Sequence, residues 1–243
     1  MPDSYRLYYW PQIQGRGEFV RLALEAGGAD YIDVARRSGK RGGGSAAIMK
    51  VLEGGDPHAP FAPPFLELDG ELISQTANIL AFLGPRLGLV PADERSRRRV
   101  QQLQLLVADF VAEAHDTHHP LATSLRYEEQ KPAARKNAKA FTTLRMTKYL
   151  GYFERVLARN PDGAQWLVGD SLSYVDLSLF QVVAGLRFAF PSAMKKLEPA
   201  YPHVVALAAR VAALPRIARY LKSKRRIAFN QSGIFRHYAE LDR

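Results

Sequence analysis

The side chains best suited to chemistry occur at a few separated places in the chain. Tyr9 closes an aromatic run, the pair Gln75-Thr76 stands where a hairpin gives way to a helix, and Asp109 lies in a long amphipathic segment. A phenol can donate a hydrogen bond, and the start of a helix attracts anions. The alternatives are core packing for Tyr9, an ordinary N-cap for Thr76 and a solvated carboxylate for Asp109.

Three histidines form a second candidate group. His115 and His119 lie four residues apart in a predicted helix, with His118 beside them. This spacing places two imidazoles on one helix face and resembles that of metal ligands. No third carboxylate or cysteine ligand accompanies them, so we expect no metal.

The chain contains no cysteine. This absence excludes disulfides, thiolate zinc sites, a CxxC redox pair and a cysteine nucleophile. Any thiol chemistry would therefore need a thiol that a second molecule supplies.

Much of the formal charge of +10 lies in three clusters, Arg36–Arg41, Arg95–Arg99 and Lys222–Arg226. Such clusters can bind nucleic acid, a membrane surface or small anions, or can be solvated helix ends and loops, which we favour. Aromatic residues are not interleaved with them, so nucleic-acid binding is not expected. The glycine-rich loop Arg36–Ser45 matches no phosphate-binding fingerprint and is predicted to be a surface loop.

The elements that must position these side chains fall into two groups. Residues 1–84 alternate short strands with helices, and Asp69-Gly70 is a strong hairpin signal between two of the strands. The expected order is β-α-β-α-β-β-α, over Arg6–Trp10, Glu18–Glu25, Tyr31–Ala35, Ala46–Glu53, Phe65–Leu68, Glu71–Ser74 and Thr76–Leu83.

The rest of the chain has helical periodicity. Residues 85–92 have the composition of a linker, and residues 93–243 are predicted to form an all-helical domain that ends in an aromatic tail. No apolar run approaches the roughly 20 residues that cross a bilayer, and the N-terminus does not resemble a signal peptide. We therefore expect a cytoplasmic protein without a membrane partner.

Together these features resemble the cytosolic glutathione transferases of the tyrosine type over essentially the full chain. The resemblance rests on Tyr9-Trp10 at the end of the first strand, on P-x-L…DG…QT from Pro64 to Thr76, and on the box Ser173–Asp176. It implies an α/β thioredoxin-like N-terminal domain plus an all-α C-terminal domain. It also implies a homodimer that uses glutathione as co-substrate against a small hydrophobic electrophile.

The same resemblance assigns thiol activation to Tyr9, with electrostatic support from Arg16. A thiol with a pKa of about 8.5 is only slightly ionised at neutral pH, and lowering that pKa by two units requires about 2.7 kcal/mol. One charge-assisted hydrogen bond contributes about 1.5–3 kcal/mol. A phenol that donates to the sulfur is therefore sufficient.

The remaining family positions would bind glutathione. Pro64 matches the family's cis proline, whose preceding residue, here Pro63, offers its backbone to the cysteinyl unit. Gln75 and Thr76 match the pair that holds the γ-glutamyl carboxylate. Asp109 matches the acidic residue that reaches the γ-glutamyl amine across the dimer interface, and Lys40, with Arg36, is the candidate for the glycyl carboxylate.

Two departures from the family pattern stand out. Pro63 has no N–H to donate, so a hydrogen bond worth roughly 0.5–1.5 kcal/mol is missing. The loop Pro11–Gln14 is also longer than usual, which affects the position of Arg16. We therefore expect weaker glutathione binding or a shifted pose.

The electrophile pocket is expected to include Trp10, His115 and His119, with the aromatic tail as another wall. The leading hypothesis is an enzyme that activates the glutathione thiolate for attack on an electrophile or a peroxide. The alternative is a transferase-like binding protein that carries anionic hydrophobic ligands with little catalysis.

Overall fold

The computed structural model describes residues 4–242. Its N-terminal part is a four-stranded sheet in the order β2-β1-β3-β4, formed by β1 (Tyr5–Tyr8), β2 (Tyr31–Asp33), β3 (Phe65–Leu68) and β4 (Glu71–Ser74). β1 and β2 are parallel, whereas β1 with β3 and β3 with β4 are antiparallel. The expected mixed β-α-β-α-β-β-α unit is confirmed.

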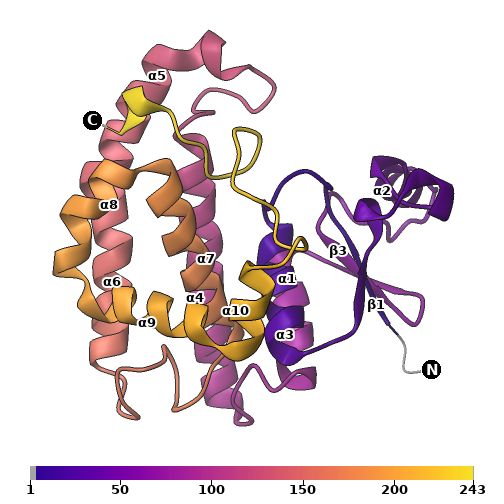
Figure 1. Cartoon of the computed structure of the whole chain (residues 1–243), viewed down its shortest axis with the longest axis horizontal. Coiled ribbons are helices and arrows are strands. Elements are labelled where there is room, and N and C mark those ends of the chain that lie inside the picture. Colours follow the sequence, from indigo (N-terminus) through magenta and orange to yellow (C-terminus); the bar gives the residue numbers. More distant parts are fainter. Residues whose placement is uncertain (1–3, 243) are drawn as a thin grey trace.

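Helices cover both faces of this sheet because its side chains alternate. α1 (Gly17–Gly27) and α3 (Thr76–Arg86) lie on the side of the helical domain, and α2 (Ser45–Leu52) lies on the opposite side (Figure 1). The paired residues Leu7 and Leu66 belong to the core under α1 and α3. The next pair, Tyr8 and Phe65, packs with Ile48 of α2.

The hairpin and the end of β1 follow from local chemistry. Asp69 and Gly70 have φ values of 51° and 81°, as a tight turn with two positive φ angles requires. β1 ends at Tyr8 rather than at the expected Trp10. Its last partner is Phe65, and Pro64, just before Phe65, has no N–H with which to continue the ladder.

The C-terminal part is a bundle of helices, of which α7 (Tyr174–Ala189) is buried at the centre. These are α4 (Glu94–Asp116), α5 (Tyr127–Ala140), α6 (Met146–Ala158), α7, α8 (Pro191–Leu197), α9 (Pro202–Ala213) and α10 (Pro215–Leu221). A π-helical turn, Phe141–Arg145, joins α5 to α6. α7 packs against α4 and α9 and also against α1, so it connects the two parts of the molecule.

The predicted box at the start of α7 is a capping box. Ser173 and Asp176 exchange side-chain to backbone hydrogen bonds, and Asp176 also accepts from the Leu167 amide at 2.8 Å. Burial raises the pKa of Asp176 to about 6, against the opposing effect of these donors. The box fixes the entry to the central helix and supports the fold rather than the chemistry.

In the described part of the chain, no single helix is long and apolar enough to cross a membrane. Among the described residues, the pair Tyr174–Ala189 and Pro191–Ala200, bent by 120°, is long and apolar enough when its two halves are taken together.

The tail after α10 contacts both parts of the molecule. It starts beside α1, crosses the face of the helical domain and ends next to α5 and α8 (Figure 1). The Gln14 side chain donates to the Ile227 carbonyl, and the Asn230 side chain donates to the Gln12 carbonyl. Farther along, Asp242 accepts from two amides at the start of α8.

Candidate active site

A cavity of about 360 Å³ lies between the N-terminal part and α4. It brings together Arg16, from the turn before α1, with Gln75 and Thr76 from the start of α3. Apolar walls come from Phe19 of α1 and from α4, which contributes Leu105 and Val111 among others. The cavity therefore combines a cation, a helix N-terminus and an apolar lining.

Thr76 and Gln75 have unusual local structure at the mouth of α3. Gln75 turns the chain with φ 68° and ψ 120°, a conformation that residues with a Cβ rarely adopt. Thr76 is the first residue of α3, and its hydroxyl oxygen is buried without a hydrogen-bond partner. The ordinary N-cap role for Thr76 is therefore wrong. A strained turn and an unsatisfied hydroxyl at a helix N-terminus are typical of a ligand site.

Tyr9 lies beneath the turn that carries Arg16. Its hydroxyl accepts a hydrogen bond from the Arg16 amide at 2.9 Å, and the side chain is buried. The ring packs directly on two glycines, because a Cβ at Gly15 would lie 2.0 Å from the Tyr9 oxygen and one at Gly17 would lie 2.5 Å from Cγ. Tyr9 is thus behind Arg16 rather than among the residues that line the cavity.

The surroundings of Tyr9 keep it protonated. Burial raises the pKa of the phenol, and the Arg16 amide together with the charges of Arg16 and Arg21 opposes that rise. The Arg21 guanidinium carbon lies 5.9 Å from the centre of the ring. Because the Arg16 bond uses a lone pair of the oxygen, the O–H hydrogen can still be donated. The phenol can act as a hydrogen-bond donor and not as a base.

The peptide bond between Pro63 and Pro64 is cis, as the resemblance predicts. Pro64 is buried, and Pro63 is half-buried before β3. Since neither residue has an N–H, only carbonyl groups can be offered to a ligand at this position.

Lys40 and Trp10 are not brought into the cavity. Lys40 is exposed in the 3₁₀ turn Gly39–Arg41. Trp10 packs against the cluster beneath α2, on the other face of the sheet. Arg36, the second cation expected in this loop, donates to the carbonyls of Lys224 and Arg225 and so holds the start of the tail.

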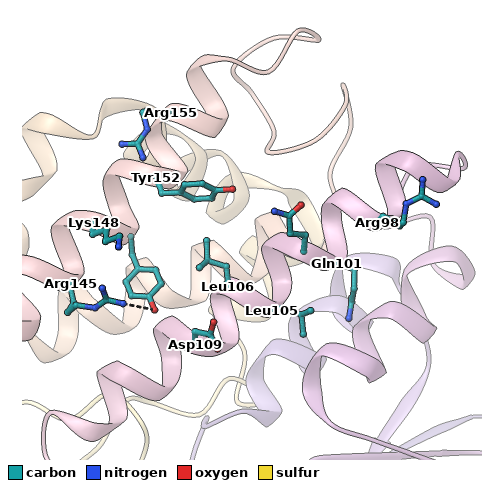
Figure 2. A pocket seen from close by; sticks show the side chains of 11 residues that line it. Arg98, Gln101, Leu105, Leu106, Asp109, Arg145, Lys148, Tyr152 and Arg155 are labelled. Atoms are coloured by element: carbon teal, nitrogen blue, oxygen red, sulfur yellow. Dashed lines mark hydrogen bonds between the residues drawn. The ribbon is translucent and has the colours of Figure 1, made fainter.

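Asp109 lies in a different groove of the same chain. This groove, of about 790 Å³, runs between α4 and α6, and Figure 2 shows Asp109 beside Leu106 and facing the α6 side chains. The cations that line this groove are partly neutralised, since Arg145 pairs with Glu113 at 2.6 Å. Within one chain Asp109 therefore does not join Thr76.

The three histidines cluster at the end of α4, with ring centres 4.8–5.3 Å apart. α4 ends at Asp116, so the prediction that His115 and His119 share one helix face is wrong. His115 pairs with Asp116, and the ring of His119 contacts the Gln130 amide. In the described chain no group of three or more acidic or histidine side chains could hold a metal.

His118 is the buried member of this cluster. Its Nε2 lies 2.8 Å from the Ile234 carbonyl, so this nitrogen carries the proton, and its Nδ1 is buried without a partner. Burial lowers the pKa of His118 to about 3. The neutral imidazole thus attaches the tail to the end of α4.

The sequence interpretation missed a buried polar network beneath Tyr9. Its charged members are Glu18 and Arg21 of α1, Asp33 at the end of β2 and Arg226 of the tail. The expectation that the cluster Lys222–Arg226 is a solvated face is wrong for Arg226, which pairs with buried Glu18 and is 11% exposed. Arg225 pairs with Glu25 but stays exposed. The spacing of Glu18 and Arg21 on one helix turn was the available signal.

Comparison with known proteins agrees with the fold. The family model described as "Glutathione S-transferase, C-terminal domain" matches residues 115–224. "Glutathione S-transferase P 1" of Xenopus laevis is 28% identical over 228 residues, which span 92% of this chain and 94% of that protein. "Glutathione S-transferase A4" of Bos taurus is 26% identical over 231 residues, spanning 91% and 90% of the two chains.

Solved structures share the fold. A Pi-class glutathione S-transferase of Onchocerca volvulus superimposes with a TM-score of 0.70 at 20% identity, over 90% of this chain and 92% of that one. A structure titled prostaglandin synthase D of Nilaparvata lugens gives a TM-score of 0.69 at 18% identity, over 91% and 98%. The thioredoxin-like domain plus all-helical domain is therefore confirmed.

Proposed function

This chain belongs to the cytosolic glutathione transferase family, and from that premise we propose that the cavity beside Thr76 binds glutathione. The protein is a glutathione S-transferase with glutathione as its co-substrate. The alternative of a carrier with little catalysis is not favoured, because the relatives are transferases by name.

The observation that carries the proposal is the unsatisfied hydroxyl of Thr76. The γ-glutamyl carboxylate of glutathione supplies the missing acceptor at the N-terminus of α3, where free amides and the helix dipole also favour an anion. The Gln75 turn aims this end of α3 into the cavity. Lys40 is the proposed partner of the glycyl carboxylate.

Thiol activation is assigned to Tyr9 and Arg16. Arg16 lines the cavity. The hydrogen bond from its backbone N–H to the Tyr9 oxygen polarises the phenol, so that its O–H is a better hydrogen-bond donor. The thiolate then attacks an electrophilic carbon of a small hydrophobic substrate or a peroxide. His115 and His119 stay proposed contributors to the substrate pocket, whereas Trp10 packs beneath α2 and lies outside the cavity.

Pro63 offers a carbonyl but no N–H to the cysteinyl unit. The glutathione complex therefore lacks one hydrogen bond that a different residue there would make, worth roughly 0.5–1.5 kcal/mol. We expect the affinity for glutathione to be lower by the factor that this loss of binding free energy gives.

The complete site requires a homodimer. Asp109 lies in the α4–α6 groove and not beside Thr76, so it can reach a γ-glutamyl amine only in a second copy. Leu105, on the same face of α4, is 52% exposed, so an apolar side chain beside Asp109 is available for contact with a second copy. A cytoplasmic role in detoxification fits this activity.

The test replaces Thr76 by Val, which keeps the shape and removes the hydroxyl. Titration calorimetry should show a loss of glutathione affinity of roughly fivefold or more, as expected for a buried hydrogen bond to a charged group. The Thr76→Ser variant, which keeps the hydroxyl, should bind like the parent protein. Equal affinity of the Val and Ser variants, or no binding by the parent protein, would contradict the proposal.

A further inference from the structure

The buried network beneath Tyr9 is balanced in charge. It contains two carboxylates, Glu18 and Asp33, and two guanidiniums, Arg21 and Arg226. The side chains of Glu18 and Arg21 are fully buried, and that of Arg226 is 11% exposed. Charges removed from water act on their neighbours with little screening.

Arg21 connects this network to Tyr9. It donates to Glu18 at 3.3 Å, to Asp33 at 2.7 Å and to the Gln14 carbonyl at 3.4 Å. Its remaining nitrogen, Nη2, is buried without a partner, and its guanidinium carbon lies 5.9 Å from the Tyr9 ring. On the network side, the charge closest to Tyr9 is therefore that of Arg21 and the groups bonded to it.

Arg226 is the only member of the four that comes from outside the N-terminal part. One of its nitrogens donates to Glu18 Oε1, which also accepts from the Tyr220 hydroxyl at 2.6 Å. Its other nitrogen donates to Gln181 at 3.0 Å, and Gln181 in turn donates to Gln14 at 2.7 Å. Arg226 of the tail thus contributes a charge and, through Gln181, supports the loop that leads to Arg16.

We propose that Arg226 is a positioning residue for the transferase reaction, which neutralises Glu18 so that Arg21 can favour an anion beside Tyr9. This inference rests on the proposed function of Tyr9. Without Arg226 the network carries one net negative charge next to the phenol. A thiolate close to the phenol is then disfavoured, although glutathione can still bind at Thr76.

The other groups around the network do not alter this argument. The phenols of Tyr220 and Tyr31 have raised pKa values, chiefly from burial, and stay neutral in the working range. Glu25 is neutralised by Arg225 at 2.8 Å. On the cavity side, Arg16 adds positive charge, and burial, with the charge of Arg16 as a lesser cause, lowers the pKa of His115.

The experiment measures the pH dependence of kcat/KM for conjugation of glutathione to an activated aryl halide, and the ultraviolet absorbance of the bound thiolate. In Arg226→Gln the acid limb of the profile should move up by about 0.5–1 pH unit, with a roughly three- to tenfold loss of rate on that limb. Glu18→Gln should move the limb in the opposite direction. Arg226→Lys, which keeps the charge, should restore the position of the limb.

The matched control is Arg225→Gln, on the same tail segment. It removes a surface ion pair with Glu25 and should leave the pH profile where the parent protein has it. A profile of Arg226→Gln that coincides with an active parent protein overturns the inference alone. A parent protein that forms no thiolate overturns the proposed function instead. If Arg226→Gln does not fold, the opposite shift in Glu18→Gln still decides the question.

Discussion

At the scale of single residues, the closest packing in the site is between Tyr9 and two glycines. Any side chain at Gly15 or Gly17 would overlap the Tyr9 ring or hydroxyl, and Gly15 also has a φ of 46°. Glycine at both positions lets the turn lie directly on the ring, so that the Arg16 amide reaches the Tyr9 oxygen. The longer loop before Arg16 is therefore compatible with an Arg16–Tyr9 contact.

The prediction at this scale concerns the Tyr9 hydroxyl. Tyr9→Phe removes the proposed donor to the sulfur and keeps the buried ring, so conjugating activity should fall by roughly 10-fold to 100-fold. Glutathione affinity, measured by calorimetry, should change little because the carboxylate contact at Thr76 is intact. Tyr8→Phe serves as the control, since the Tyr8 hydroxyl donates to Glu67 at 2.6 Å and the Tyr8 ring packs with Phe65 on the α2 side of the sheet. Full activity of Tyr9→Phe would show that another group stabilises the thiolate.

At the scale of elements, the tail contacts α1, the end of α4 and α7, and so holds these helices together. Ile234 and Phe235 are buried, and a Cβ at Gly185 of α7 would lie 2.3 Å from the Phe235 ring. Phe229 stacks on Phe188 at 5.1 Å. The tail therefore packs against the loop that contains Gln14 and Gly15, and a small cavity of about 10 Å³ lies between them.

The attachment of the tail at His118 predicts a dependence of stability on pH. Burial, with the charge of Arg236 as a further cause, lowers the folded-state pKa to about 3, and the unfolded side chain titrates near 6.5. Protons therefore favour the unfolded state between these values. The stabilisation is present above about pH 6.5 and is lost as the pH falls, by about 2 kcal/mol at pH 5.

Urea denaturation at several pH values measures this effect. His118→Gln should be less stable at neutral pH and should lack this part of the decline between about pH 6.5 and pH 5. His58→Gln, at an exposed position in the loop before β3, is the matched control and should follow the parent protein. A parallel decline in His118→Gln and the parent protein would rule out His118 as the source.

At the scale of the whole molecule, the proposed dimer makes each site dependent on the other copy. The face of α4 that carries Leu105 and Asp109 borders the groove in Figure 2. Two of the arginines that line this groove, Arg98 and Arg145, are already paired with Glu94 and Glu113 of the same chain. These cations therefore oppose association of two copies less than the net charge of +10 suggests.

The dimer prediction separates assembly from ligand contact. Leu105→Glu should give a monomer in sedimentation equilibrium, because a charge replaces an apolar side chain at the interface. Asp109→Asn should stay dimeric and raise the KM for glutathione several-fold with a smaller effect on kcat. A monomeric parent protein, or a dimeric Leu105→Glu variant with unchanged KM, would place the interface elsewhere.

Much of the framework could be predicted from local sequence patterns. Asp69-Gly70 fixes the hairpin because both residues take positive φ. Ser173 and Asp176 fix the start of α7 because the capping box involves only four consecutive residues. The cis bond before Pro64 agrees with the resemblance. These features depend on neighbours in the chain, so the sequence contains the necessary information.

The tertiary structure decided the partners of charged and polar side chains that are distant in sequence. Arg226 looked like part of a solvated cluster, but the return of the tail to α1 buries it on Glu18, which lies 208 residues away. His119 does not share a helix face with His115, because α4 ends at Asp116. Tyr9, from the sequence alone, was either a donor or a core residue; the glycine turn makes it a buried phenol held by Arg16. Local propensity determines turns and caps, whereas the pairing of buried charges depends on which segments the packed core brings together.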